Sequence, residues 1–367
     1  MGGDDEDAEP SLAERVLKME NKHDAFNVYL NYSAAGIAES GSGDDKVGFR
    51  CKQLRLEIKG NLTEHIYYRL RHRLNKASEA AGGDNFAKAT DDMMVGYRFS
   101  DKWEVQAGKM FPYWGGFEYD TNPMYIYQYS DMVDNHDSPK AGFVALYKPV
   151  PTQEFVVEVC NARNDKLETA FPGIAAQGVR DARAPLDYIV NWNGNFANRR
   201  LQTRWACGLR TLAKDTYSRH LALGQKLNLP KLQCYVDYYW ESADIDRLGV
   251  ITREAAHLLP AGQKHAENVV YHTVVTKADW QFATRWNAFA KAAYETASVV
   301  KGVAALHNYR KHYSYLAGVE FYPDKSQDFR VSLSCIGQSL RYTGESTLEN
   351  RDEGRVEIGM MYRIKCF

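Results

Sequence analysis

Long hydrophobic runs are missing from this sequence of 367 residues. No stretch approaches the roughly 18 uncharged apolar residues that a membrane-spanning helix needs, so such a helix is excluded. A barrel whose strands cross the membrane is not excluded, because its apolar residues alternate with polar ones and its average hydropathy is low. The chain is 44% hydrophobic, which is enough for a core and argues against disorder.

Motifs for catalysis and metal binding are also missing. The six cysteines show no C-x-x-C spacing and are interpreted as small apolar side chains. There is no H-E-x-x-H, P-loop, G-x-S-x-G or dinucleotide-binding motif. The 46 Lys and Arg nearly balance the 47 Asp and Glu, which gives no reason to expect a nucleic-acid partner. We predict no catalytic residue, no metal site and no cofactor, and a protein that is not an enzyme.

Aromatic residues are abundant, with 24 Tyr, 15 Phe and 7 Trp, and they lie in alternating segments. Leu54, Leu56 and Ile58, for example, alternate with three charged residues, and the next segment after a tight connection does the same. This period of two predicts strands. About sixteen such segments follow one another from residue 26 to 364, each close to the 9–11 residues of a membrane-crossing strand.

The connections between these segments are alternately short and long. The predicted short turns are at residues 60–63, 100–102, 148–151, 193–195, 228–231, 276–279 and 323–325. The predicted long segments are 36–45, 75–87, 111–137, 162–184, 243–267, 291–308 and 342–353, and only 213–216 is short where a long loop is due. Outer-membrane barrels have this pattern, with short periplasmic turns and long extracellular loops. We therefore predict an all-β fold, a transmembrane antiparallel barrel of about sixteen strands. The Ala-rich stretch 286–306 is the one segment that could be partly helical.

The alternation alone does not determine whether the apolar or the polar face of the strands points inward. A soluble protein buries its apolar face in a core, whereas a wide membrane barrel turns that face to lipid and its polar face to a wet lumen. A closed barrel of about sixteen strands is too wide for side chains to fill, and this favours the membrane barrel.

With the polar face inward, basic residues form a wall. The pore-lining basic candidates are Arg55, Lys59, Arg69, Arg71, Arg73 and Arg98 on three successive predicted strands, with Arg200, Arg204 and Arg210 as a second group. Same-face residues are about 6.8 Å apart along a strand, so the first group is contiguous. Such a wall would raise the local anion concentration, although a solvated face that carries charge for solubility is the alternative. Asp91 and Asp92 are interpreted as loop residues, and His307 and His312 beside Arg310 as part of a cationic rim.

Several segments resemble the phosphate-selective porin O and P family. They are residues 68–75, which resemble an early strand, and 107–109, 115–120 and 126–130, which resemble the segment leading into and through the third loop. The terminal Phe367 matches the aromatic C-terminus of barrel proteins. The resemblance implies a sixteen-stranded trimeric porin of the Gram-negative outer membrane, with its third loop folded into the lumen as a constriction.

On this resemblance, residues 111–137 are the third loop. Its constriction candidates are Glu118, Tyr119, Asp120, Tyr127 and Asp131. The segment has five acidic residues and no Lys or Arg, whereas the resemblance implies lysines at the constriction of phosphate-specific members. An acidic loop opposite a basic wall would produce a transverse field across the pore.

We therefore predict an outer-membrane porin for passive diffusion of small hydrophilic solutes, with an anion preference. The expected partners are the lipid bilayer, lipopolysaccharide and two further copies in a homotrimer. The alternatives are a channel specific for oligosaccharide or phosphate, a soluble all-β carbohydrate-binding protein, and a barrel enzyme with its active site on the lipid-facing surface. For that enzyme, His72 is the one clear outward histidine of the pattern, and it has no catalytic partner.

The N-terminal segment differs from the rest. No apolar region typical of a secretory signal precedes the acidic stretch at residues 4–9, so we expect that a signal peptide has been removed. Apolar residues then follow a heptad-like spacing over two heptads. We expect residues 1–24 to be a periplasmic segment, either a short coiled coil that caps a trimer or a lone helix at the barrel mouth, and residues 25–367 to be the barrel.

Overall fold

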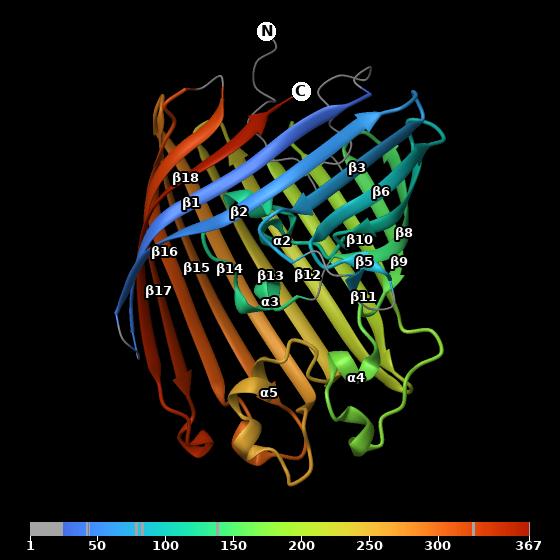
Figure 1. Ribbon diagram of the computed structural model, residues 1–367, viewed down its shortest axis with the longest axis vertical. Coiled ribbons are helices and arrows are strands. Elements are labelled where there is room, and N and C mark those ends of the chain that lie inside the picture. Colours follow the sequence, from blue (N-terminus) through green and yellow to red (C-terminus); the bar gives the residue numbers. More distant parts are fainter. Residues whose placement is uncertain are drawn as a thin grey trace.

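The computed structural model describes residues 25–41, 43, 45–77, 80–81, 84–136, 139–324 and 327–366. Within these residues, sixteen antiparallel strands close into one barrel (Figure 1). The expected N-terminal helix or coiled coil and the terminal Phe367 lie outside the described residues.

The strands that close the barrel are β1 (Asn27–Ser40), β2 (Lys46–Asn61), β3 (Ile66–Arg73), β6 (Thr90–Arg98), β7 (Trp103–Met110), β8 (Lys140–Val150), β9 (Gln153–Asn161), β10 (Leu186–Phe196), β11 (Leu201–Ala213), β12 (Thr216–Leu229), β13 (Leu232–Ile245), β14 (Glu267–Ala283), β15 (Trp286–Val299), β16 (Arg310–Phe321), β17 (Asp328–Tyr342) and β18 (Arg351–Lys365). Two further strands, β4 (Ala80–Ala81) and β5 (Phe86–Ala87), form a separate hairpin.

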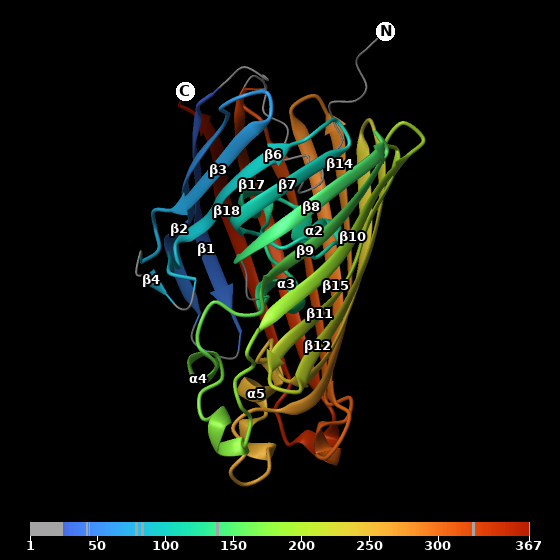
Figure 2. The same ribbon diagram turned by 90° about the vertical axis from the view of Figure 1, so that its right-hand side faces the viewer.

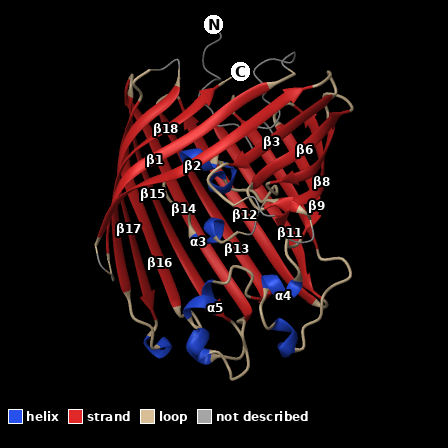
Figure 3. Ribbon diagram, in the orientation of Figure 1, coloured by secondary structure: helices blue, strands red, loops and turns tan. Residues whose placement is uncertain are grey.

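The helices are short and lie in the connections between strands, as Figure 3 shows. They are α2 (Phe117–Asp120), η1 (Pro123–Tyr125), α3 (Asp131–Asp134), α4 (Leu167–Ala170), η2 (Ile174–Gln177), α5 (Val250–Glu254), η3 (Ala256–Leu258), η4 (Ala304–Leu306) and η5 (Gly344–Ser346). None of the helices in the described part of the chain is long and apolar enough to cross a membrane.

Each barrel strand pairs with the barrel strands before and after it, and β1 pairs with β18 to close the ring, from Tyr29 opposite Lys365 to Ser40 opposite Gly354. This closed antiparallel barrel confirms the predicted fold. The side chains alternate as predicted for a membrane barrel. On β9, Val157 is 55% exposed on the outside, whereas its neighbour Glu158 is 1% exposed on the inside. The exposed large apolar residues thus lie on the outer surface of the wall.

The two rims differ. β1 begins and β18 ends at one rim, which has short turns, and α4 and α5 lie in longer connections at the opposite rim (Figures 1 and 2). The short connection predicted at 213–216 is confirmed, because only Lys214 and Asp215 separate β11 from β12.

Several predicted loop limits are wrong. β1 extends to Ser40 and β15 to Val299, so residues 36–40 and 291–299 are strand rather than loop. Of the stretch 286–306, residues 286–299 are strand and only Ala304–Leu306 is helical, as η4. On β15, small outward alanines alternate with inward Phe289 and Lys291. Alanine gives little strand signal, although the period of two is intact. The turn predicted at 193–195 lies instead at residues 197–200, after the end of β10.

The barrel wall is not equally high. The strands β3, β6 and β7 have 8, 9 and 8 residues, whereas β13, β14 and β15 have 14, 17 and 14. Figure 2 shows the short strands in the upper part of the molecule, with long strands behind them. The wall is therefore low where β3, β6 and β7 form it.

Candidate functional site

The connection between β7 and β8 enters the barrel, where α2 and α3 lie inside the ring of strands (Figure 1). We call its residues 111–136 the constriction loop. Its first fixed point is Asp237 on β13, whose carboxylate accepts hydrogen bonds from the backbone N–H groups of Phe117 at 2.9 Å and Glu118 at 2.7 Å. Gly116 has φ of +80°, and a Cβ there would lie 2.0 Å from the hydroxyl oxygen of Tyr239. Only glycine fits this close approach to the wall.

Glu118 braces the constriction loop from within and is fully buried. Its carboxylate accepts hydrogen bonds from the backbone N–H of Ser130 at 2.8 Å and from the Ser130 hydroxyl at 2.6 Å, and it forms an ion pair with Lys291 on β15. Asp120 lies 3.5 Å from Nε of Arg204 on β11. Both predicted acidic residues are thus paired with cations of the wall.

The two predicted tyrosines contact aromatic and polar groups inside the barrel. Tyr127 stacks on Phe289 of β15 with ring centroids 4.5 Å apart, and its hydroxyl donates to Glu320 at 2.9 Å. Tyr119 is half-buried, and its ring meets that of His136 edge-on at 5.3 Å. The loop therefore packs on several strands of the tall wall.

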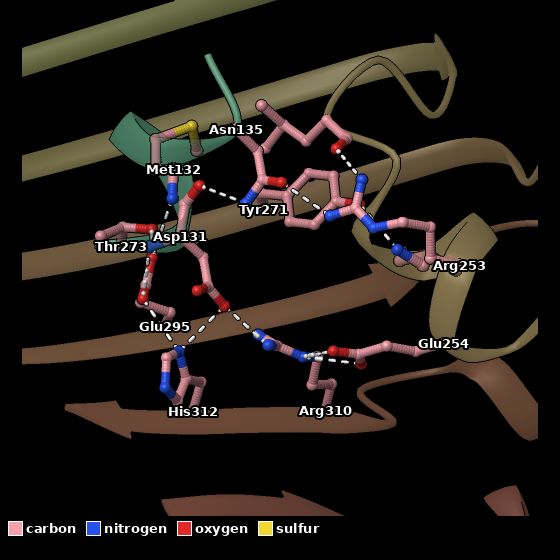
Figure 4. A network of polar contacts seen from close by, with 12 residues as sticks. Asp131, Met132, Asn135, Arg253, Glu254, Tyr271, Thr273, Glu295, Arg310 and His312 are labelled. Carbon is pink, nitrogen blue, oxygen red and sulfur yellow. Dashed lines mark hydrogen bonds and ion pairs between the residues drawn. The ribbon is translucent and has the colours of Figure 1, made fainter. Parts of the chain in front are cut away.

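Asp131 is the centre of a third attachment, drawn in Figure 4. Its backbone N–H and that of Met132 donate to the carboxylate of Glu295 on β15, at 2.9 and 3.1 Å. Nδ1 of His312 on β16 lies 2.9 Å from Asp131 Oδ2 and 3.2 Å from Glu295 Oε2. Arg310 pairs with Asp131 at 2.6 Å. We call this set the loop anchor.

The loop anchor also reaches an outer loop, because Nε of Arg310 donates to Glu254 of α5 at 2.8 Å. Burial would raise the pKa of Asp131, but the hydrogen bonds and charges of His312 and Arg310 outweigh it and lower this pKa to about 2. The carboxylate therefore stays ionised at neutral pH.

One atom from each of Asp131, Glu295 and His312 could meet at a metal ion, since these atoms lie within 4.8 Å of one another. Both oxygens of Glu295 already accept hydrogen bonds, and the cation Arg310 shares the Asp131 oxygen that faces His312. Ion pairs and hydrogen bonds account for this geometry without a metal.

The predicted basic wall is present on β2 and β3. Arg55 lies opposite Arg73 in the strand pairing, and Lys59 opposite Arg69. Arg55, Arg69 and Arg71 are buried and Arg73 is half-buried. The carboxylate of Asp91 lies 2.9 Å from Arg55 and 2.7 Å from Arg73.

Asp91 and its neighbour Asp92 belong to β6 and not to a loop, which corrects their interpretation from the sequence. Asp92 pairs with Arg71 at 3.1 Å, and Glu57 pairs with Arg69 at 2.9 Å. These carboxylates offset part of the charge that the arginines bring to the wall.

Three further cations extend this wall across β1 to β18. Lys52 and Arg355 share Glu357, at 2.6 and 2.7 Å, and Arg363 lies 3.6 Å from Glu57. Lys52 and Arg355 also contact the constriction loop, because Lys52 lies over the ring of Tyr127 at 5.8 Å and Arg355 donates to the carbonyl of that residue at 3.3 Å. We call these cations and carboxylates of β18, β2, β3 and β6 the basic wall.

Four cations of the basic wall are more exposed than its carboxylates, whereas Arg55, Arg69 and Arg71 are buried. The side chains of Arg73, Lys52, Arg355 and Arg363 are 29, 20, 23 and 21% exposed. Their partners Asp91, Glu57 and Glu357 are 0 to 4% exposed. Water in the lumen therefore meets guanidinium and ammonium groups in front of buried carboxylates.

The other predicted basic residues have different surroundings. Lys59 is buried with its ammonium 5.3 Å from the centroid of the Tyr29 ring. Arg98 is half-buried and donates to Asn61 at 3.0 Å. The wall position predicted for Arg200 is wrong, because this residue is exposed in the turn 197–200. The sequence predicts the preceding turn at residues 193–195, so Arg200 is assigned to the next strand and to its inward face.

Arg204 and Arg210 both lie inward on β11, as predicted, and both meet the constriction loop. Arg204 lies over the ring of Phe117 at 5.2 Å, and Arg210 over that of Trp114 at 4.9 Å. Arg210 also pairs with buried Asp187. These two arginines therefore help to hold the loop.

Sequence reasoning missed the loop anchor and half of the basic wall. The pair Arg310 and His312 was interpreted as a rim, although their spacing of two residues already places them on one face of a strand. Lys52 faces inward because the register of β2 is irregular opposite Ser33 and Ala34. Counting alternate residues along the strand does not reveal this irregularity.

No curated protein matches this sequence. Among solved structures, the outer-membrane channel DcaP of Acinetobacter baumannii is similar with a TM-score of 0.64 at 10% identity, over 92% of this chain and 96% of that chain. An anion-selective porin from Comamonas acidovorans has a TM-score of 0.60 at 7% identity, over 93 and 100%. The in-vitro folded trimer form of OmpT from Vibrio cholerae has a TM-score of 0.54 at 11% identity, over 93 and 100%.

These likenesses show the fold. The sequence itself matches the family model of the phosphate-selective porin O and P over residues 26–364, which includes nearly the whole barrel. The chain belongs to this family, and it is an outer-membrane porin through which small solutes pass by diffusion.

Proposed function

We propose that this porin prefers small hydrophilic anions, and that the basic wall is the structure that selects them. The observation that carries the proposal is the difference in exposure between its cations and its carboxylates. In the described part of the wall, seven cationic side chains (Lys52, Arg55, Arg69, Arg71, Arg73, Arg355 and Arg363) face four carboxylates (Glu57, Asp91, Asp92 and Glu357). The excess is three positive charges, and the four cations that water reaches are 20 to 29% exposed.

Of the four described carboxylates of the constriction loop, three are paired with cations of the barrel, and Asp134 alone is exposed. Glu118 and Asp120 are paired with Lys291 and Arg204, and Asp131 is paired with Arg310. Charges that line a water-filled pore with low-dielectric walls act over a Debye length of about 8 Å at physiological salt. We infer that permeating ions meet the unbalanced cations of the basic wall.

Bilayer recordings across a salt gradient test this proposal. The reversal potential should indicate anion preference, and the combined Arg73→Gln, Lys52→Gln and Arg355→Gln variant should reduce it. The matched control is Arg219→Gln, an exposed arginine of β12 that pairs with Asp244 outside this wall. A cation preference in the unmutated porin would overturn the proposal.

A channel specific for phosphate or oligosaccharide is the alternative. The described part of the constriction loop offers no Lys or Arg to a phosphate, and this favours a general pore. The two functions differ in a competition measurement. Phosphate or maltotriose at low concentration should leave the chloride conductance unchanged in a general pore and should block it in a specific one.

We also propose that the porin works as a homotrimer in a bilayer that contains lipopolysaccharide, after removal of a signal peptide, with residues 1–24 on the periplasmic side. The trimer form of the similar OmpT fold supports the assembly. We propose no catalytic role: outward His72 is half-buried and its Nδ1 lies 3.1 Å from the Thr90 hydroxyl on the barrel wall. Turnover of phospholipid by the purified protein would contradict this.

A further inference from the structure

The connection between β13 and β14 lies at the rim with the longer connections and contains α5 and η3 (Figure 1). We call its residues 246–266 the outer loop. Asp246 orders the first turn of this loop, because its carboxylate accepts hydrogen bonds from the backbone N–H groups of Gly249 at 3.0 Å and Thr252 at 2.7 Å. The Tyr271 hydroxyl on β14 donates to the same carboxylate at 2.6 Å. The helix α5 is therefore a firmly held element that starts from the barrel wall.

The outer loop reaches both ends of α3, the second helix of the constriction loop. Nη2 of Arg253 donates to Oδ1 of Asn135 at 2.6 Å, and Asn135 is the residue that caps the C-terminal end of α3. The next residue, Glu254, accepts a hydrogen bond from Arg310 at 2.8 Å. Arg310 in turn pairs with Asp131, the first residue of α3. Figure 4 shows the two links side by side.

Apolar packing joins the same two elements. Side chains of α3 and of the outer loop belong to one buried cluster, whose members include Met132, Leu248, Val250 and Ile251, each 0 to 4% exposed. Side chains packed at the density of a protein interior transmit a displacement to their neighbours. Asp134, on the same helical turn as Met132, is exposed, so α3 borders the water-filled part of the barrel. A shift of the outer loop would therefore move a wall of the pore.

The far end of the outer loop is tied to a neighbouring connection, residues 162–185 between β9 and β10. Oε1 of Gln177 accepts hydrogen bonds from the backbone N–H groups of Lys264 at 2.7 Å and His265 at 3.1 Å. Nε2 of His265 lies 2.9 Å from the carbonyl oxygen of Pro172. We call these bonds the latch. Among the described residues, none of the bonds of Gln177 reaches the constriction loop.

We infer that the outer loop positions α3, so that a load on the outer surface of the porin changes the current through the constriction. The loop anchor fixes α3 to the wall through Glu295 and His312. Arg253 and Glu254 are positioning residues that fix α3 to a connection with an exposed surface, which includes Ala261. Long connections of outer-membrane barrels face the outside of the cell. A macromolecule that binds one position of this connection better than another shifts α3 with it.

A load placed on the outer loop tests this inference. A biotin-acceptor peptide is inserted between Ala261 and Gly262, at an exposed loop tip that tolerates insertion. Streptavidin, added on the side of the bilayer that this rim faces, should raise the frequency of transitions between current levels several-fold. The matched control has the same peptide between Lys214 and Asp215, in the short turn at the same rim. None of the described bonds of this turn reaches the outer loop or α3, so streptavidin should leave its current unchanged.

A second variant separates this effect from obstruction of the pore mouth by streptavidin itself. Arg253→Ala combined with Glu254→Ala removes both polar links to α3 and leaves the bound streptavidin in place. The rise in transitions should then fall by at least half. Lys301→Ala combined with Glu345→Ala is the control, because it removes one exposed charge of each sign from other connections at this rim. A rise that is undiminished without Arg253 and Glu254 would overturn the positioning of α3 by the outer loop.

The latch allows a third measurement, in the porin without streptavidin. Gln177→Ala removes the latch at a residue that does not contact the constriction loop, and transitions between current levels should become several-fold more frequent. Glu168→Ala is the control, since Glu168 accepts hydrogen bonds only from Gly173 and Ala175 of its own connection. Heat-modifiable gel mobility should be the same for both variants. A Gln177→Ala current as quiet as the native one would overturn transmission from the outer surface to α3.

These measurements are independent of the proposed anion preference. None of the variants changes the basic wall, so all of them should keep the reversal potential of the native porin. If α3 does not respond to the outer loop, the proposed selectivity still stands. Conversely, a porin without anion preference still shows the response to streptavidin, because that response depends on the contacts of α3 and not on the charges of the wall.

Discussion

Nε of Arg73 on β3 lies 2.7 Å from Oδ1 of Asp91 on β6, and the carboxylate is completely buried behind the guanidinium. Asp91 also pairs with Arg55 and lies 3.5 Å from Arg71. One carboxylate thus holds three arginines in a row. Repulsion between neighbouring guanidinium groups is reduced, while the more exposed face of the row remains positive.

The first prediction concerns this carboxylate. Asp91→Asn removes a negative charge from behind the basic wall, so the reversal potential should shift further toward anion preference. Stability should fall by about 3–5 kcal/mol, because loss of one partner leaves buried charge uncompensated. Heat-modifiable gel mobility, read as the temperature at which the folded band is lost, measures the second effect.

Asp352→Asn is the control for that prediction. Asp352 also pairs with an arginine, Arg341, at 2.7 Å, but these side chains are 68 and 40% exposed. Exposed pairs contribute about 0–1 kcal/mol, so this variant should leave gel mobility and reversal potential unchanged. If Asp91→Asn behaved like Asp352→Asn, the assigned role of the buried carboxylate would be wrong.

The second prediction concerns the brace inside the constriction loop. Glu118→Gln leaves the buried ammonium of Lys291 without its ion-pair partner, and Lys291→Met leaves the carboxylate of Glu118 in the same state. Each single change should destabilise the loop by about 3–5 kcal/mol. The double variant should cost less than the sum, since no buried charge remains unpaired. Conductance noise in single channels measures how firmly the constriction loop is held. If the effects of the two single variants on this noise add up in the double variant, Glu118 and Lys291 are not coupled.

The barrel was predictable because its signal is repeated. Each strand shows the period of two, and the short and long connections alternate along the whole chain. The limits of β15 were missed because Ala288, Ala290 and Ala292 satisfy the period but have no strand propensity. The period of two identifies the face of the strand on which each residue lies, and this is sufficient to predict the barrel architecture.

The site was only partly predictable, because it depends on contacts between distant segments. Asp91 and Arg55 are 36 positions apart, and Asp131 and Arg310 are 179 apart. The sequence indicated cations on one face of β2 and β3, but not that β6 would place acids behind them. Similarly, the acids of the constriction loop were visible as charges, while their pairing with Lys291, Arg204 and Arg310 depends on where the loop packs.

The third prediction concerns Glu295, which accepts hydrogen bonds from two backbone N–H groups of α3 and from the Thr273 hydroxyl at 3.0 Å. Glu295→Ala leaves these donors buried without a partner, at a cost of about 1–3 kcal/mol each. The loop anchor should loosen, and single-channel current should fluctuate between levels. Thr273→Val removes one hydroxyl and leaves the backbone contacts, so the current of this variant should fluctuate far less. Equal noise in both variants would contradict the anchoring role of Glu295.

The last prediction uses the pKa of Asp131, which is about 2 in the folded porin against an ordinary value of 3.8. Because the folded value is the lower one, ionised Asp131 stabilises the loop anchor at every pH above about 4, and this contribution is lost as the pH falls toward 2. The groups facing it are Glu295, His312 and Arg310. Current noise in the native porin should therefore rise between pH 4 and pH 2, whereas Asp131→Asn should be equally noisy at pH 7 and pH 3. Asp134→Asn changes an acid of the same helical turn that makes none of the loop-anchor bonds, and it should keep the native dependence on pH. A native porin whose noise does not change down to pH 2 would show that the Asp131 carboxylate does not hold the constriction loop.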